Sequence, residues 1–315
     1  MDVFLGGPTK DKVRKELDKP LIEKISKTGG ERLPYFGLAG PLMLDIIECQ
    51  DYLSDFTIVE RSYAGKKQSS RERAIHELLM RTALTTELKD GRGVIHDYLD
   101  VIYGDIDKDI IAQGKGDFGK TLGSKWYGLI NLDYYGGIFK AKYREDAVKQ
   151  LIIDEDANCS SDCDYILLLT VENLDRGKTE KQFLVDEILQ NLEKARIEVS
   201  SLELLKSFLI TCSYGLLQKI YVPIKIYLFA RSCGSELHCE RPIIYHEEST
   251  KGEQHAEMLH FRFVISIKKR RKIAPQMIKD IVEICNLDLL TVSESRIIQH
   301  PTQTPRLLFN GVEIE

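Results

Sequence analysis

The sequence predicts an α/β protein with a Rossmann-like, doubly wound, mostly parallel sheet and an antiparallel final strand pair. From residue 33 onward, apolar runs of strand length alternate with segments of helical periodicity. One of these runs, 165–171, is apolar almost throughout, as expected for a central parallel strand that is covered on both faces. Because strands separated by helices are the order of a doubly wound sheet, we expect a ligand beyond the carboxyl ends of the strands.

The first half of the predicted sheet follows a charged N-terminal segment. Residues 1–30 close on Thr28-Gly29-Gly30, so we expect a solvated helical arm that ends at a glycine. The elements expected next are a strand from 33 to the glycine turn at 37–40, a helix around 42–47, a strand at 56–60, a helix at 71–84 behind a serine cap, and a strand at 98–103.

The second half of the sheet is expected to end on two antiparallel strands joined by a polar connection. Its expected elements are a strand at 126–133, a helix at 144–153, a strand at 165–171, helices at 181–196 and 202–217, and the two final strands at 220–230 and 260–267. The main domain therefore covers residues 31–272, and residues 273–315 are expected to form a C-terminal helix and tail.

The composition is that of a water-soluble globular protein. Of the 315 residues, 43% are hydrophobic and 30% are charged, and the formal net charge of −5 argues against a protein coated in basic surface. Apolar stretches fall short of the roughly 20 residues that span a bilayer, and residues 1–10 contain no hydrophobic signal region. We therefore expect a cytoplasmic protein whose seven scattered cysteines are free thiols rather than a disulfide framework.

The turn after the first predicted strand is the strongest local signal for a ligand site. Gly37 and Gly40 would let backbone amides approach a ligand at the positive end of the following helix. Glu60 lies twenty residues past Gly40 and closes the second strand, where an acid in a dinucleotide-type fold binds ribose hydroxyls. The alternative interpretation is a tight loop and a solvated strand end.

Four segments in this order resemble class I S-adenosylmethionine-dependent methyltransferases. Leu38-Ala39-Gly40-Pro41 is similar to the F-A-G-P-G turn of cytosine-specific DNA methyltransferases and three-cysteine-motif partner proteins. Glu60 stands at the ribose-binding acid of the family, and Tyr103-Gly104-Asp105 at its adenine-side acidic loop. Residues 132–136 resemble the D-P-F-G or D-P-Y-G motif of tRNA guanine dimethyltransferases, beside the methyl donor. The resemblance implies S-adenosylmethionine as cofactor, with Gly37, Ala39, Gly40, Glu60 and Asp105 as the residues that bind it.

The fourth segment also carries the candidate catalytic residues. Methylation of an exocyclic amine needs an acceptor for the amino group and an aromatic face for the base, which Asp133 and Tyr135 would supply. Alternation along the strand places Asn131 on the same side as Asp133. In the alternative interpretation, Asn131 and Asp133 only end a strand and the tyrosines pack against the next helix.

Three positions depart from the pattern of the family. Phe36 stands where an acid is common, Leu42 replaces the third glycine of the turn, and Tyr134 replaces the proline of the catalytic motif. These departures favour a second hypothesis, in which the chain is a catalytically lapsed binding or sensing subunit of a multi-protein bacterial defence or modification system. An NAD-dependent oxidoreductase is a third hypothesis, but the G-x-G-x-x-G spacing is absent.

Basic residues in two loops are the candidates for binding RNA or DNA. One run follows the last predicted strand and consists of Lys268, Lys269, Arg270, Arg271 and Lys272. The other surrounds the loop after Glu60, at 61–73. The alternative interpretation of both runs is a solvated turn on a mildly acidic protein.

Other chemistries have weaker signals. Cys159 with Cys163, and Cys233 with His238 and Cys239, do not form the paired C-x-x-C pattern of a structural zinc site. The sequence contains no G-x-x-x-x-G-K-[ST] phosphate loop, so an NTPase is disfavoured, and it presents no recognisable Ser, His and Asp trio of a hydrolase.

Overall fold

Five parallel strands form the half of the sheet that carries the glycine turn. They are β1 (Leu33–Gly37), β2 (Leu53–Glu60), β3 (Leu99–Tyr103), β4 (Leu129–Asp133) and β5 (Cys163–Glu172). Their lateral order is β3-β2-β1-β4-β5, and every neighbouring pair is parallel. The chain adds β2 on one side of β1 and β4 on the other, so the order reverses between β1 and β4.

The other half of the sheet is built around one long reversed strand. β8 (Ala256–Ile267) runs antiparallel to β5 along the whole length of β5. β7 (Ile243–Glu247) and β6 (Glu236–Cys239) both pair antiparallel with β8. The predicted fold class, a mostly parallel sheet with an antiparallel strand pair, is confirmed.

The strand expected at 220–230 is wrong, because these residues belong to a helix. α10 (Tyr214–Ser232) packs against α7, α8, β6 and β8 and is buried on nearly every side. A helix that is apolar all round has no helical periodicity to detect, and its continuous apolar run is then indistinguishable from a buried strand. The strands that pair with β8 come instead from 236–247, which the sequence suggested was a polar connection.

The C-terminal segment also differs from the helix and tail expected at 273–315. β9 (Leu289–Val292) pairs parallel with β7, and β10 (Ile297–His300) pairs antiparallel with β9, so both extend the sheet. β11 (Leu308–Phe309) and β12 (Val312–Glu313) form a separate two-stranded ribbon. With only four residues or fewer, these strands are too short for a period of two to stand out.

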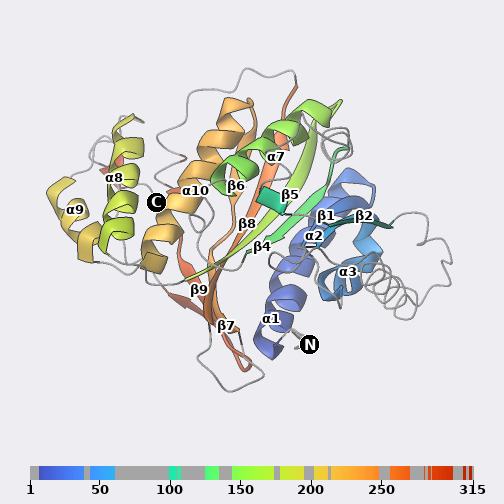
Figure 1. Cartoon of the computed structure of the whole chain (residues 1–315), viewed down its shortest axis with the longest axis horizontal. Coiled ribbons are helices and arrows are strands. Elements are labelled where there is room, and N and C mark those ends of the chain that lie inside the picture. The colour runs from blue at the N-terminus through green and yellow to red at the C-terminus, as the bar shows by residue number, and fades with distance from the viewer. Residues whose placement is uncertain are drawn as a thin grey trace.

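Helices cover both faces of the sheet, which gives three layers (Figure 1). On one face, α7 (Arg144–Asn158), α8 (Lys178–Lys194) and α10 share one apolar core with the strands, and α9 (Leu202–Thr211) packs on α8. On the other face, a second core joins the strands to α2 (Lys19–Gly29) and α3 (Leu44–Cys49), which continues into the 3₁₀ turn η2 (Gln50–Tyr52).

The N-terminal arm is helical, as predicted, but it is packed on the sheet rather than solvated. It consists of α1 (Pro8–Val13), the π-helical turn η1 (Arg14–Asp18) and α2, and it stops where Gly30 adopts a φ of +72°. Leu21, Ile22 and Ile25 are buried against the second core. Their helical spacing gives the arm an apolar face that its high charge content obscures.

The structure is a computed structural model, and it describes only part of the chain. The described residues are 7–38, 43–60, 99–103, 105–107, 125–134, 144–173, 178–194, 202–211, 214–247, 256–269, 280, 283–284, 286–300, 308–309 and 312–313. The helix predicted at 71–84 lies outside them. Among the helices that are described, none combines the length and apolar character needed to cross a bilayer.

Cysteine pairing differs from the expectation of free thiols. Cys159 and Cys163 form a disulfide across the loop between α7 and β5. Cys49, Cys233 and Cys239 remain thiols. Within the described part of the chain, no three His, Cys, Asp or Glu side chains gather as metal ligands would.

A buried carboxyl group on α7 gives a prediction about pH. Glu155 is 1% exposed and accepts a hydrogen bond from the backbone N–H of Tyr127 at 2.8 Å, and burial raises the pKa of its carboxyl well above the ordinary 4.5. The folded state therefore holds a proton that the unfolded state releases, so stability falls as pH rises above about 4.5. Glu155→Gln is expected to remove this loss and to stabilise the protein at pH 8 by more than about 1 kcal/mol.

Urea unfolding at pH 5 and pH 8 measures this effect. Glu236→Gln is the matched control, because Glu236 is exposed on β6. Equal stability changes for the two variants at both pH values would contradict the prediction.

Candidate functional site

The carboxyl ends of β1 and β4 form the topological switch point of the sheet, where doubly wound proteins bind ligands. Gly37 pairs with Asn131, and the backbone N–H of Leu38 donates to the Asn131 carbonyl at 3.0 Å. A Cβ atom on Gly37 would lie 2.3 Å from that carbonyl oxygen. Glycine is therefore required at this position for the close approach of β1 to β4.

Asn131 and Asp133 lie on one side of β4, as alternation predicts. Leu132 between them is fully buried in the opposite core. Both polar side chains line a cavity of about 20 Å³, which is room for a single water molecule. The Asn131 amide donates to Asp45 Oδ2 at 3.1 Å. The two predicted polar groups at the end of β4 thus face one small space.

The N-terminal arm supplies the cations of this space. The Lys10 ammonium group forms an ion pair with the Asp133 carboxylate. The Arg14 guanidinium forms ion pairs with Asp45 and Asp11. Burial alone would lower the pKa of Arg14, but these two carboxylates raise it above its ordinary value. Asp133 at the end of β4 and Asp45 at the start of α3 are therefore neutralised by cations of the same chain.

A hydrogen-bonded chain of three side chains lies beside this space. The Thr170 hydroxyl contacts His260 Nδ1 at 2.8 Å, and His260 Nε2 contacts Asp18 Oδ1 at 3.0 Å. The order resembles a hydrolase triad that the sequence did not suggest, since the residues lie on β5, β8 and η1. All three residues are buried, so in this arrangement a substrate cannot reach the hydroxyl. The chain ties the arm to the sheet.

Asp105 lies in a different environment, after the end of β3. Its Oδ1 accepts a hydrogen bond from the Asp107 backbone N–H at 3.2 Å. Asp107 forms a buried ion pair with Arg144 at 3.4 Å, and burial raises the pKa of the Asp107 carboxyl despite this partner. The Arg144 guanidinium stacks 4.0 Å from the centre of the Tyr134 ring. Tyr134, which replaces the proline of the motif, thus packs against the start of α7.

Several predicted site residues cannot be placed. Glu60 is the last residue of β2, opposite Tyr103 of β3, but its side chain is not described. The predicted residues that lie outside the described part of the chain are Ala39, Gly40, Tyr135, Arg270, Arg271 and Lys272, together with the basic loop at 61–73.

The basic run begins near the amino ends of the parallel strands, whereas Asp133 lies at their carboxyl ends. Asp133 pairs with Thr170 on β5, whereas Ile267, one residue before Lys268, pairs with Cys163. Thr170 and Cys163 are seven residues apart, which corresponds to about 23 Å of strand. One nucleobase cannot contact both Asp133 and Lys268.

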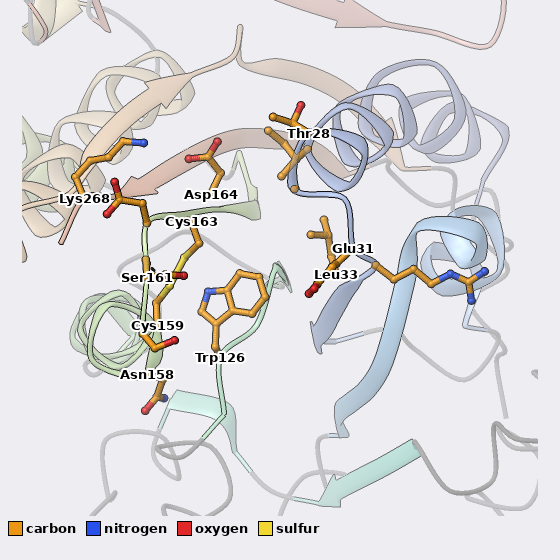
Figure 2. Close-up of a pocket in the computed structure, with 15 residues that line it drawn as sticks. Thr28, Glu31, Leu33, Trp126, Asn158, Cys159, Ser161, Cys163, Asp164 and Lys268 are labelled. Atoms are coloured by element: carbon orange, nitrogen blue, oxygen red, sulfur yellow. Dashed lines mark hydrogen bonds between the residues drawn. A yellow bond between two sulfur atoms is a disulfide. The ribbon is translucent and has the colours of Figure 1, made fainter. Parts of the chain in front are cut away.

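Lys268 instead lines a larger cavity, of about 550 Å³, at the amino ends of the parallel strands (Figure 2). In this view Trp126 lies between the Cys159–Cys163 loop and Leu33. The neighbouring Lys269 ammonium donates to the Asp156 backbone carbonyl at 2.5 Å. At least one cation of the run, Lys269, therefore already has a partner in the same chain.

Sequence reasoning missed most of the residues that surround Asp133. These are Lys10 and Arg14 on the arm, Asp45 on α3, Thr170 on β5 and His260 on β8. Only Asp45 carried a signal, since it follows the glycine turn in the first turn of the next helix. The others come together only through the sheet order and the packing of the arm.

In comparisons with known proteins, this chain is similar to solved structures but matches nothing else that was compared. No family model and no curated protein matches the sequence. A precorrin-6y C5,15-methyltransferase from Geobacter metallireducens aligns over 82% of this chain and 90% of its own, at 10% identity and a TM-score of 0.34. A SAM-dependent methyltransferase from Agrobacterium tumefaciens aligns over 82% and 62%, at 9% identity and a TM-score of 0.35. An O-methyltransferase family protein from Burkholderia thailandensis aligns over 82% and 57%, at 8% identity and a TM-score of 0.33.

Proposed function

We propose that this chain is an S-adenosylmethionine-dependent methyltransferase whose donor binds at the carboxyl ends of β1, β2 and β3. The observation that carries the proposal is the sheet order β3-β2-β1-β4-β5-β8-β7 with β8 reversed, which places a switch point beside the glycine turn. This mostly parallel sheet with an antiparallel end is what the resemblance to class I methyltransferases implies. The strands that precede the four resembling segments, β1 to β4, all end at the same edge of the sheet, which supports the proposal.

The described residues fit a nucleoside donor at this edge. Gly37 ends β1, Glu60 ends β2, and Asp105 follows β3, so the three positions succeed one another across neighbouring parallel strands. Backbone amides of the turn that contains Gly37, Ala39 and Gly40 would hold the amino-acid part of the donor. Glu60 would accept hydrogen bonds from the ribose, and Asp105 would contact the adenine side. The bound donor would supply the activated methyl group.

The acceptor in this proposal is an exocyclic amine of a nucleic-acid base. Asp133 and Asn131 would orient the amine through hydrogen bonds, and Tyr135 would stack on the base. The basic run from Lys268 would then bind phosphates about 23 Å away from the reacting base. At roughly 3.4 Å per nucleotide step, an acceptor that contacts both places extends over about seven steps.

The second candidate function is a lapsed methyltransferase fold that serves as a binding or sensing subunit of a multi-protein bacterial system. It is favoured by one observation of the site. The carboxylate of Asp133 is already paired with Lys10, and the space around it is only about 20 Å³. The two functions differ in whether Asp133 is ever available to an acceptor.

Methyl transfer that depends on Asp133 tests the proposal. Calorimetry with S-adenosylmethionine, S-adenosylhomocysteine and NAD establishes the donor. Transfer of labelled methyl groups to mixed cellular RNA, DNA and protein is then compared between wild type, Asp133→Ala and the control Asp51→Ala, whose side chain is exposed. We expect Asp133→Ala to lower transfer at least about 100-fold while donor affinity stays within about tenfold.

Two results would overturn the proposal. Binding of NAD in preference to S-adenosylmethionine would contradict the donor. Donor-bound wild type without transfer to any of the three pools would leave the binding subunit as the supported function.

A further inference from the structure

The tip of the N-terminal arm, which is α1 (Pro8–Val13), lies across the proposed acceptor position. Lys10 of α1 forms an ion pair with Asp133, and Arg14 of η1 forms one with Asp45. The cavity that remains is about 20 Å³, which is room for a single water molecule. An acceptor base therefore cannot reach Asp133 as long as α1 keeps this place.

We propose that α1 is a movable cover of the acceptor site, and that the Lys10 ammonium group takes the place of the acceptor amine on Asp133. The proposal rests on the proposed function of Asp133. In the covered state the chain excludes acceptors and keeps the carboxylate neutralised. In the open state α1 swings away from the ends of β4 and β5, and Asp133 is free to orient an incoming amine.

The arm is built in two parts that are held differently. Its root begins at the end of η1, where the Asp18 carboxylate accepts a hydrogen bond from His260 Nε2 at 3.0 Å and Arg262 donates to the Leu17 backbone carbonyl at 3.0 Å. The ion pair at its tip is partly exposed, since the side chains of Lys10 and Asp133 are 19% and 21% exposed, whereas Thr9 and Val13 of the tip are buried. The tip can therefore be released while the root stays in place.

The junction between the two parts has a suitable local structure. Residues Arg14–Asp18 form a π-helical turn, a rare form that is associated with functional sites. Beyond its ion pair, the tip contributes Val13 to a small apolar cluster on β7, β8 and β9, and Lys12 donates to the Glu294 carbonyl at 3.3 Å. For the tip to open about the π-helical turn, these contacts and the packing of α1 on β7 and β9 must be broken.

Hydrogen exchange of the full-length protein tests the cover without reference to activity. We expect amides of α1 to exchange at least about tenfold faster than those of β4 and β5, because opening of the tip does not require global unfolding. Lys10→Glu places a negative charge beside Asp133 and is expected to accelerate exchange in α1 at least about tenfold further, with α2 unchanged. Lys15→Glu, exposed on the same arm, is the control and should leave α1 within about twofold of wild type.

Methyl transfer to mixed cellular RNA gives the second readout. Lys10→Met removes the ammonium group without adding a charge, and it should raise the initial rate about three- to tenfold over wild type. The control is Lys15→Met, which should not change the rate.

The outcomes separate the two proposals. If α1 exchanges only as fast as β4 and β5, or if Lys10→Met leaves the rate of an active enzyme unchanged, the cover is overturned and the methyltransferase stands. If exchange in α1 responds to Lys10→Glu but no variant transfers methyl groups, α1 is a movable cover of Asp133, whereas the methyltransferase and the acceptor role of Asp133 are overturned.

Discussion

Gly37→Ala is expected to lower the free energy of unfolding by about 3 kcal/mol, at the upper end of the usual cost of overpacking. The added Cβ would lie 2.3 Å from the Asn131 carbonyl oxygen and 2.9 Å from the Tyr35 hydroxyl. Both are held rigidly, because Asn131 lies on a central strand and Tyr35 is fully buried. To make room, β1 and β4 must separate, and the hydrogen bond from Leu38 N–H to the Asn131 carbonyl is then lost.

A glycine without neighbours supplies the control for this substitution. Gly29 is the last residue of α2, and a Cβ there would meet no atom within 4 Å. Gly29→Ala should therefore be neutral or stabilising by up to about 1 kcal/mol, since alanine favours the helix. Urea unfolding of both variants measures the contrast. A Gly37→Ala variant as stable as wild type would show that β1 and β4 do not approach as closely as described.

The sheet was predictable because its strands carry their own signal. β1, β4 and β5 are short apolar runs that end at glycine or polar residues, and each was expected within a few residues of its actual limits. α10 was not predictable in the same way, because a helix buried on every side has no polar face. Its apolar run predicts a strand paired with β8, and β7 is the strand that takes this place in the structure.

The site was predictable only where one strand determines it. Asn131 and Asp133 share a side because alternation is a local property of β4. Their partners Lys10 and Asp45 lie 123 and 86 residues away in sequence from Asp133 and Asn131, respectively. No local pattern links residues at such distances, so the covering of Asp133 emerges only from the packing of the arm across the sheet. The pairing of β8 with β5 shows that Lys268 is near the amino ends of the parallel strands, away from Asp133.

Arg144→Met is expected to destabilise the protein by about 3–5 kcal/mol, because it leaves a buried carboxylate without its counter-charge. The side chains of Arg144 and Asp107 are 6% and 7% exposed, so water cannot replace the guanidinium. Burial already raises the pKa of Asp107, and removal of Arg144 would raise it further. Since the folded state then prefers the protonated acid, the deficit should be largest near pH 8 and shrink as pH falls toward 4.

The double variant Asp107→Asn with Arg144→Met separates charge from packing. Asparagine carries no charge to leave unpaired, so the double variant should recover about half of the loss or more at pH 8. Lys125→Met is the control, because its pair with Asp100 at 2.7 Å is about half exposed and should contribute less than about 1 kcal/mol. Urea unfolding at pH 5 and pH 8 measures all three. A loss for Arg144→Met that is independent of pH, and that the second substitution does not reduce, would assign the effect to packing of Arg144 on Tyr134 instead of to the buried charge of Asp107.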